Sequence, residues 1–293
     1  MTLLQDRIAS AFISACRDEL EAPKPGNVHV FAAGHGWSVA DFVRSAAAAA
    51  ASISRRESSV GARILGAVEA THAAVGRNSN LGIVLLCAPL ARAAESPRAD
   101  LRAAVADVLA SLDLQDAELA FRAIALAAPG GLGRVERHDV FQPATTTLRE
   151  AMKEAASRDR VARQYATEFD DVFDFGVPLF DTAERRWGDS PMAAALSVYL
   201  GFLATFPDSH IARKHGEAVA AAVRNEAAPL HARLQDADDP AALFDDLLAL
   251  DASLKRRGIN PGVSADLTVA VIFARRLHRV RSQNILQSTP NND

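Results

Sequence analysis

Nine consecutive residues near the N-terminus place carboxylate, ammonium and imidazole groups beside residues that constrain the backbone: Glu21-Ala22-Pro23-Lys24-Pro25-Gly26-Asn27-Val28-His29. The two prolines fix φ and hold Lys24 out of a helix, whereas Gly26 permits a sharp turn or the close approach of a ligand. A rigidly presented ammonium beside a backbone N–H suits a phosphate group. The same residues also fit an ordinary helix end, and this segment alone does not separate the two interpretations.

Two later segments contain groups that suit an anion. Arg77-Asn78-Ser79-Asn80 precedes a strongly apolar stretch, so its donors would lie at a helix N-terminus. Pro129-Gly130-Gly131-Leu132-Gly133-Arg134 could form a concavity of backbone N–H groups. An Asn-capped helix start is the alternative for the first segment. The second segment matches neither the dinucleotide-binding nor the P-loop glycine pattern, which disfavours both of those folds.

Two acidic segments complete the set of candidates. Asp208 stands at a helix start, followed one turn later by Arg213 and Lys214. Asn260-Pro261-Gly262 precedes the last strong helix, and Asp266 falls in its first turn. Asp208 could cap a helix or bind a metal, and the basic pair could equally be a solvated helix face. Acidic first-turn residues are common in helices, so Asp266 alone is also open to a structural interpretation.

These segments must be positioned by helices, because alanine and leucine dominate and β-branched alternating runs are nearly absent. We predict an all-α fold with one domain over residues 1–282 and a disordered tail over 283–293. Ser38, Asp208 or Ser209, and Ser264 are the predicted N-caps. The expected helices lie roughly at 3–20, 38–55, 58–76, 80–95, 98–111, 114–128, 146–157, 159–170, 190–206, 210–229, 240–256 and 263–282.

The composition excludes several classes of protein. A net charge of −4 with scattered Lys and Arg provides no basic face, so nucleic acid is not an expected partner. The longest uncharged apolar run, 81–90, is too short to span a bilayer, and the N-terminus does not resemble a secretory signal. Cys16 and Cys87 fit buried free thiols in a reducing compartment. We therefore expect a cytoplasmic location, and a helical protein of this kind could form a homodimer.

Taken together, the five segments resemble the triphosphoribosyl-dephospho-CoA synthase family over roughly residues 21–267. The likeness rests on the following blocks: Glu21 with Pro23-Lys24-Pro25-Gly26, Gly34-His35, Asn78-Ser79-Asn80-Leu81-Gly82, Pro129-Gly130-Gly131, Asp208 with Arg213, and Asn260-Pro261-Gly262 through Asp266-Leu267. Several ordered blocks are more specific than any single one. The resemblance implies an all-helical enzyme.

The chain also departs from the lyase-associated members of that family. His29 stands where they have an aspartate, and Ser79-Asn80-Leu81-Gly82 replaces a Thr-His-Lys-Gly-like element. These features, with the stretches at 158–165 and 212–216, resemble a divergent branch found in methanogens and in bacteria that use methanopterin-type cofactors. The fold carries over directly, whereas the acceptor substrate is the part that this departure affects.

The reaction that the resemblance implies is a glycosyl transfer from ATP, which serves as a substrate. The ribose 2′-hydroxyl of dephospho-CoA attacks the anomeric carbon of ATP, adenine is expelled and the triphosphate is retained. The transition state should be oxocarbenium-like, which favours a nearby carboxylate and a base. The triphosphate calls for Mg²⁺ and cationic side chains.

The site residues follow from the resemblance and from their chemistry. Glu21, His29, His35 and Asp266 are the catalytic candidates, because carboxylates can stabilise the developing cation and histidines exchange protons near neutral pH. Glu21, Asp208 and Asp266 are the candidate Mg²⁺ ligands. The candidate nucleotide and phosphate contacts are Lys24, Gly26, Arg77, Asn78, Asn80, Gly130, Gly131, Arg213, Lys214 and Asn260.

Two other functions remain open at this level. A related ATP-dependent enzyme could act on a different acceptor in methanopterin-type one-carbon cofactor biosynthesis, which the altered segment at 79–82 motivates. A helical protein that binds nucleotide without turnover is the third hypothesis. It is disfavoured because Glu21, Lys24, Asp208 and Asp266 are all present, and a degenerate binder need not keep every carboxylate.

Overall fold

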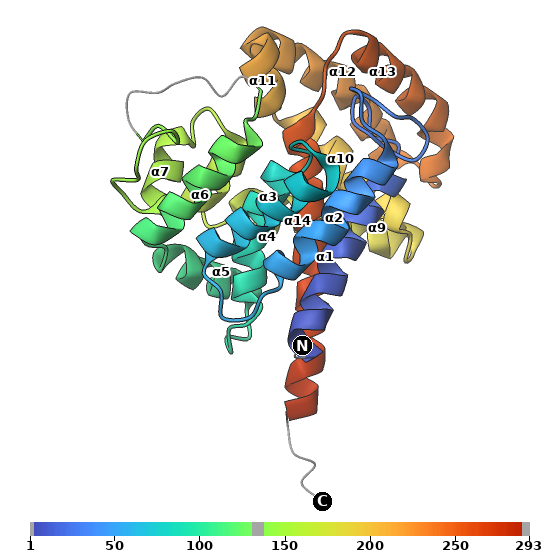
Figure 1. Cartoon of the computed structure of the whole chain (residues 1–293). Coiled ribbons are helices and arrows are strands. Elements are labelled where there is room, and N and C mark those ends of the chain that lie inside the picture. Colours follow the sequence, from blue (N-terminus) through green and yellow to red (C-terminus); the bar gives the residue numbers. More distant parts are fainter. Residues whose placement is uncertain (1–2, 131–137, 289–293) are drawn as a thin grey trace, which may run out of the picture.

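The structure is a computed structural model that describes residues 3–130 and 138–288. All regular structure in these residues is helical, which confirms the predicted all-α fold (Figure 1). The N-terminal half contains α1 (Leu3–Glu21), α2 (Val39–Ile53), α3 (Val60–Val75), α4 (Leu81–Ala93), α5 (Leu101–Ala110), α6 (Leu114–Ala127) and α7 (Leu148–Ala155). The C-terminal half contains α8 (Arg160–Ala166), α9 (Val177–Trp187), α10 (Pro191–Thr205), α11 (Ser209–His215), α12 (Glu217–Asp236), α13 (Phe244–Arg256) and α14 (Gly262–Ser288).

Helix α14 runs through the middle of the molecule, with α1, α4 and α10 packed against it (Figure 1). Its first half is apolar on nearly every side, from Val263 to Ala274, and almost all of these residues are buried. A helix that is apolar all round is stable only inside a core. The central position of α14 therefore follows from its sequence, and it fixes where the N-terminal turn of that helix lies.

Small residues allow the N-terminal helices to approach one another closely. Ala46, Ala49 and Ala50 bury one face of α2, which packs against both α1 and α3. Gly61 of α3 donates its N–H to Asp116 Oδ1 of α6 at 2.6 Å. A Cβ atom at position 61 would come within 2.6 Å of the Asp116 carbonyl oxygen. The α3 and α6 backbones can touch only because this residue is glycine.

Two of the three predicted N-caps are confirmed. Ser38 forms a capping box with Asp41 at the start of α2, and Asp208 caps α11. The prediction for Ser264 is wrong, because α14 already begins at Gly262. Ser264 instead donates its backbone N–H and its hydroxyl to Asp208 Oδ2, both at 2.8 Å.

The helix boundaries differ from the predicted ones in three places. The expected helix over 210–229 is divided at Gly216, whose φ of +93° ends α11 before α12 begins. Helix α9 was not expected. It continues directly from a π-helical segment, Asp171–Gly176, and has Pro178 in its first turn, where proline needs no hydrogen-bond partner.

The third difference concerns the C-terminus, where α14 continues to Ser288 rather than ending at 282. The rest of the predicted tail lies outside the described residues. A short 3₁₀ segment, Pro240–Leu243, precedes α13. Cys16 and Cys87 are buried free thiols, as expected. Within residues 3–130 and 138–288, no helix has the length and apolar character needed to cross a membrane.

Candidate active site

A cavity of about 900 Å³ opens between the loop after α1, the N-terminal turns of α4 and α14, helix α11, and the group α6, α7 and α8. Eight of the predicted site residues line it: His35, Arg77, Asn78, Gly130, Arg213, Lys214, Asn260 and Asp266. Six do not: Glu21, Lys24, Gly26, His29, Asn80 and Asp208. Gly131 lies outside the described residues. Segments separated by more than 200 residues in the sequence therefore meet at one cavity.

The loop over residues 22–37 is held rigidly from both sides. Tyr199 donates its hydroxyl to Pro25 O at 2.7 Å, and Gly26 N–H donates to Asp251 Oδ1 at 2.8 Å. Gly26 has a φ of +82°, and a Cβ atom there would lie 2.7 Å from Pro261 Cδ. The predicted requirement for glycine is thus real, but it serves the packing of the loop against the start of α14 rather than direct contact with a ligand.

Lys24 is fully buried and donates to Glu19 in a short ion pair, with Asn27 Oδ1 accepting a second bond at 3.2 Å. Burial lowers the pKa of Lys24 and raises that of Glu19, and the attraction between the two groups opposes both shifts. The sequence suggested that Lys24 presents a free ammonium to a phosphate. In the structure its ammonium is paired with Glu19 and does not line the cavity. Its partner Glu19 does line the cavity.

Glu21, the predicted carboxylate of this loop, is exposed at the end of α1 and does not line the cavity. The helical repeat explains the difference, because residues two apart point to nearly opposite sides of a helix. Glu19 is therefore the acidic residue that α1 presents to the site. Asn27 lies beside it and donates Nδ2 to Asn260 Oδ1 at 2.8 Å, which joins the loop to the start of α14.

The two predicted histidines occupy different environments. His35 lines the cavity and donates Nε2–H to Gly26 O at 2.8 Å. His29 is fully buried outside the cavity, with Nε2 3.4 Å from Asp251 Oδ2, and burial lowers its pKa. His29 is placed to support the loop, whereas His35 can meet a ligand.

His210 is a cavity residue that the sequence did not single out. Burial, followed by the charges of Lys214 and Arg213, lowers the pKa of His210 to about 3, so the imidazole is neutral at physiological pH. Its Nε2 atom is buried and has no hydrogen-bond partner among the described residues. A neutral imidazole with an unused nitrogen can bind a ligand group.

Asp266 is an acidic side chain that faces the cavity without a hydrogen bond to another described residue. Its carboxylate lies against Gly82 at the start of α4, where a Cβ atom would come within 2.0 Å of Oδ2. Burial, together with the charges of Asp208, Glu19 and Asp159, raises the pKa of Asp266 well above its ordinary value. This carboxyl group is thus poised to exchange a proton or to bind a cation.

Asp208 does not share this environment. Its Oδ1 accepts the N–H groups of His210 and Ile211, and its Oδ2 accepts both donors of Ser264. With four hydrogen bonds, this buried carboxylate joins α11 to α14. The predicted metal set of Glu21, Asp208 and Asp266 is therefore not assembled, and no cluster of three metal-binding side chains occurs in the described parts of the chain.

The predicted asparagines also divide into two groups. Asn78 lines the cavity and its Oδ1 accepts Leu81 N–H at 3.1 Å, so it satisfies a free donor at the start of α4. Asn80 is buried, does not line the cavity, and has no partner for Nδ2 among the described residues. Asn260 lines the cavity and is oriented by Asn27.

Several cationic side chains line the cavity. Arg213 donates to Gly130 O at 3.2 Å and to Asp159 Oδ2 at 3.1 Å. Lys214 is exposed beside Gly130, and no hydrogen bond or ion pair joins it to another described residue. Arg77 donates to Gly36 O at 2.5 Å and lies over the Trp37 ring, 3.6 Å from its centroid. These groups can meet an anionic ligand.

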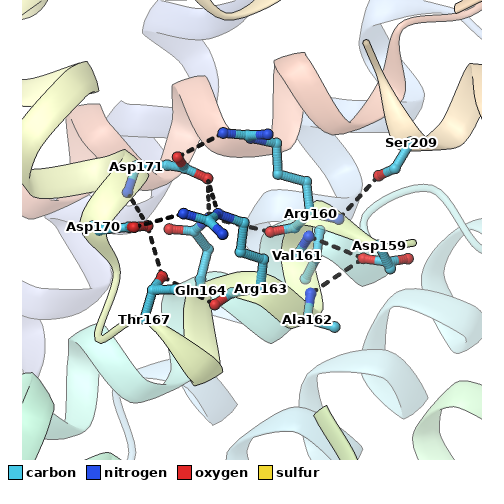
Figure 2. Close-up of polar contacts among 10 residues, drawn as sticks. All are labelled: Asp159, Arg160, Val161, Ala162, Arg163, Gln164, Thr167, Asp170, Asp171 and Ser209. Atoms are coloured by element: carbon cyan, nitrogen blue, oxygen red, sulfur yellow. Dashed lines mark hydrogen bonds and ion pairs between the residues drawn. The ribbon is translucent and has the colours of Figure 1, made fainter. Parts of the chain in front are cut away.

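Figure 2 shows how α8 fixes Asp159, the partner of Arg213. Asp159 Oδ1 accepts the N–H groups of Val161 and Ala162, and the next residue, Arg160, donates its N–H to Ser209 Oγ at the start of α11. The start of α8 is thus linked to α11, the helix that carries Arg213 and Lys214.

Sequence reasoning missed Glu19, Asn27, Arg158, Asp159 and His210, all of which line the cavity. Glu19 could have been found by extending the helical repeat of α1 backwards from the proline segment, and Asn27 stood inside the motif itself. Asp159 precedes a helix, where an acidic cap is the simpler explanation. Its second role, as partner of Arg213, depends on the tertiary structure.

Comparisons with known proteins identify the fold and the family of the chain. A solved structure from Archaeoglobus fulgidus, whose assignment as a triphosphoribosyl-dephospho-CoA synthase is itself provisional, is similar with a TM-score of 0.62 and 24% identity over 78% of this chain and 95% of that one. This likeness concerns the fold. The chain has no significant match among curated proteins. The family of ATP:dephospho-CoA triphosphoribosyl transferases matches residues 5–285, and the chain therefore belongs to this enzyme family.

Proposed function

We propose that the protein transfers the triphosphoribosyl group of ATP to the 2′-hydroxyl of 3′-dephospho-CoA and releases adenine. The bond between the ribose anomeric carbon and adenine breaks, with its electron pair going to adenine. A new bond forms between that carbon and the acceptor oxygen. The hydroxyl proton leaves to a base, and adenine takes up a proton. Membership of the family supports this reaction for the chain.

The observation that carries the proposal is the distribution of charge in the cavity. Asp266 lines it without a hydrogen-bond partner among the described residues, and the cationic side chains of Arg213 and Lys214 line it as well. An oxocarbenium-like centre needs a nearby carboxylate, and a triphosphate needs cations. We assign the anomeric carbon to the Asp266 end and the triphosphate to Arg213 and Lys214.

Asp266 is the proposed base for the acceptor hydroxyl. Because its pKa is raised by burial and by neighbouring carboxylates, the group has more basic character than an exposed aspartate. Gly82, which has no side chain, leaves room for this carboxylate at the start of α4. The Glu19–Lys24 pair also belongs to the site and contributes a second carboxyl group, whose pKa is raised by burial although the charge of Lys24 opposes that shift.

The residues present fit Mg²⁺ only if the substrate contributes ligands. Mg²⁺ prefers oxygen and is commonly held by one or two carboxylates together with phosphates and waters. Asp266 is such a carboxylate, with Glu19 as the second candidate, whereas Asp208 is fully engaged elsewhere. When bound with ATP, the ion would neutralise triphosphate charge. We therefore expect the activity to require Mg²⁺.

The direct test is to incubate the purified protein with ATP, Mg²⁺ and dephospho-CoA and to analyse the products by liquid chromatography and mass spectrometry. Omission of each component in turn provides the controls. Adenine and a triphosphoribosyl adduct should appear together, and only in the complete mixture. ATP binding without adenine release would contradict the proposal and favour another acceptor in cofactor biosynthesis.

A further inference from the structure

We propose that the apolar end of the cavity, formed by α6, α7 and α8, binds the uncharged arm of the acceptor, and that Arg158 binds the adjoining phosphate. This inference rests on the proposed function, because dephospho-CoA consists of a nucleoside diphosphate joined to a pantetheine arm. It adds a subsite that determines which acceptor is used.

The side of the cavity formed by α6, α7 and α8 contributes several apolar side chains to its lining. Phe121 and Ile124 of α6, Met152 and Ala155 of α7, and Val161 of α8 form one end. Phe121, although only 4% exposed, lines the cavity together with Ile124 of the same helix. Three helices thus contribute a group of apolar side chains to a cavity whose lining is mixed, with further apolar residues such as Leu81 and Ile83 on α4.

This end of the cavity suits an uncharged ligand group better than a polyphosphate. Burying a phosphate against Phe121, Ile124 and Met152 would remove its hydration without supplying a cation. Methyl and methylene groups, by contrast, are stabilised when their apolar surface is removed from water. The volume of about 900 Å³ also lies near the upper end of the range of ~300–1,000 Å³ for ligand sites. One nucleotide would leave part of it empty.

Arg158 connects this apolar wall to the charged part of the site. It follows α7 closely, lines the cavity and is exposed. Its NH1 donates to Glu154 O at 3.3 Å, which leaves other guanidinium donors for a ligand. An arm seated against Ala155 and Met152 would place its terminal phosphate near the same helix end. Arg213 and Lys214, on α11, then remain for the triphosphate of ATP.

The test is to compare ligand affinities by isothermal titration calorimetry for the wild type, Ala155→Phe and Ala156→Phe. Ala155 lines the cavity, whereas the adjacent and equally half-buried Ala156 does not. ADP serves as an acceptor analogue that lacks the arm. We expect Ala155→Phe to weaken dephospho-CoA binding about tenfold or more, because the added ring occupies the subsite. ADP and ATP should bind to it as they do to the wild type, and Ala156→Phe should bind all three normally.

A second variant, Phe121→Ala, tests the same wall by removing contact area instead of adding bulk. It should also weaken dephospho-CoA binding selectively, with thermal unfolding confirming that the fold is retained. The inference is overturned if the wild type binds ADP and dephospho-CoA equally, or if both variants bind dephospho-CoA normally. Selective loss of binding in a protein that releases no adenine would remove the proposed reaction but keep the subsite. If adenine is released but binding does not depend on the arm, the proposed reaction is kept and the subsite is removed.

Discussion

Two polar regions of the molecule meet at Asp159 and differ in whether their charged side chains are paired. On one side, the α8 network consists of Arg160, Arg163, Gln164, Asp170 and Asp171, whose charged groups pair with one another (Figure 2). On the other side, the cavity contains Asp266 and Lys214, for which no hydrogen bond to another described residue occurs. The same kinds of side chain are therefore satisfied in one region and unused in the other.

This difference separates groups that stabilise the fold from groups that are available to a ligand. A desolvated charge without a partner, such as that of Asp266, costs stability, and such groups concentrate where function needs them. Lys214 is exposed and is available to a ligand without that cost. We therefore expect changes in the α8 network to alter the free energy of unfolding, and changes in the cavity to alter kinetics. A cavity variant that changed only stability, or an α8-network variant that changed only kinetics, would contradict the comparison.

The largest effect should come from Asp266→Asn. Loss of the carboxylate removes the proposed base and the cation contact, so kcat for adenine release should fall by about 10²–10⁴-fold. The melting temperature should stay the same or rise, because the amide has no buried charge. Steady-state kinetics and circular dichroism melting measure the two properties. A kcat within about tenfold of the wild type would remove Asp266 from the proposed mechanism.

The α8 network should give the opposite result with Asp171→Ala. Asp171 is buried and accepts from Arg160 at 2.7 Å and from Gln164 at 2.6 Å. Its removal leaves these donors unsatisfied, so the free energy of unfolding should fall by about 3–5 kcal/mol. Urea unfolding measures this loss, and KM for ATP should change little at temperatures where the variant is folded. Full stability would show that the network is only a surface feature.

Some of this division could be predicted from the sequence, and the reasons are specific. Helix patterning and capping residues predicted the all-α fold, and the proline–glycine segments indicated the loops beside the cavity. These features could be predicted because they depend on residues that are close together in the sequence. The hydrogen-bond or ion-pair partner of each charged residue could not be predicted, because it depends on the tertiary structure. Asp208 and Asp266 are both acidic residues at helix starts, yet one is engaged by Ser264 and the other faces the cavity. Lys24 was expected at a phosphate but is paired with Glu19, a residue on the opposite side of α1 from Glu21.

Arg213→Ala sharpens the comparison at the cationic side of the cavity. Its loss should raise KM for ATP by about 10–100-fold, since a hydrogen bond to a charged group contributes about 1.5–3 kcal/mol. The matched control is Arg163→Ala on α8, which pairs with Asp170 at 2.8 Å and does not line the cavity. Arg163→Ala should lower the melting temperature and leave KM for ATP unchanged. Equal KM values for the two variants would contradict the assignment of Arg213 to the triphosphate.

The smallest effect concerns the change of the free energy of unfolding with pH. The contributions of Asp266 and Asp251 to this change should have opposite signs. Burial acts to raise the pKa of Asp251, but hydrogen bonds involving His29, Lys255 and the Gly26 N–H outweigh it and lower that pKa. Asp251 therefore contributes stability above its unfolded pKa, and this stability is lost as pH falls through the folded pKa. For Asp266 the folded pKa is raised, so the native state binds more protons above about pH 4, and stability falls as pH rises.

Urea unfolding at a series of pH values from about 3 to 8 would resolve the two contributions. The stability of Asp266→Asn relative to the wild type should increase with pH from about pH 4, by at most ~1.4 kcal/mol per pH unit, and level off above the folded pKa. Asp251→Asn should become relatively less stable over the lower part of the same range, because it lacks the contribution that the wild type gains there. Parallel curves for the two variants would mean that a paired and an unpaired carboxylate behave alike, and the contrast between the two kinds of polar group would then fail at its simplest point.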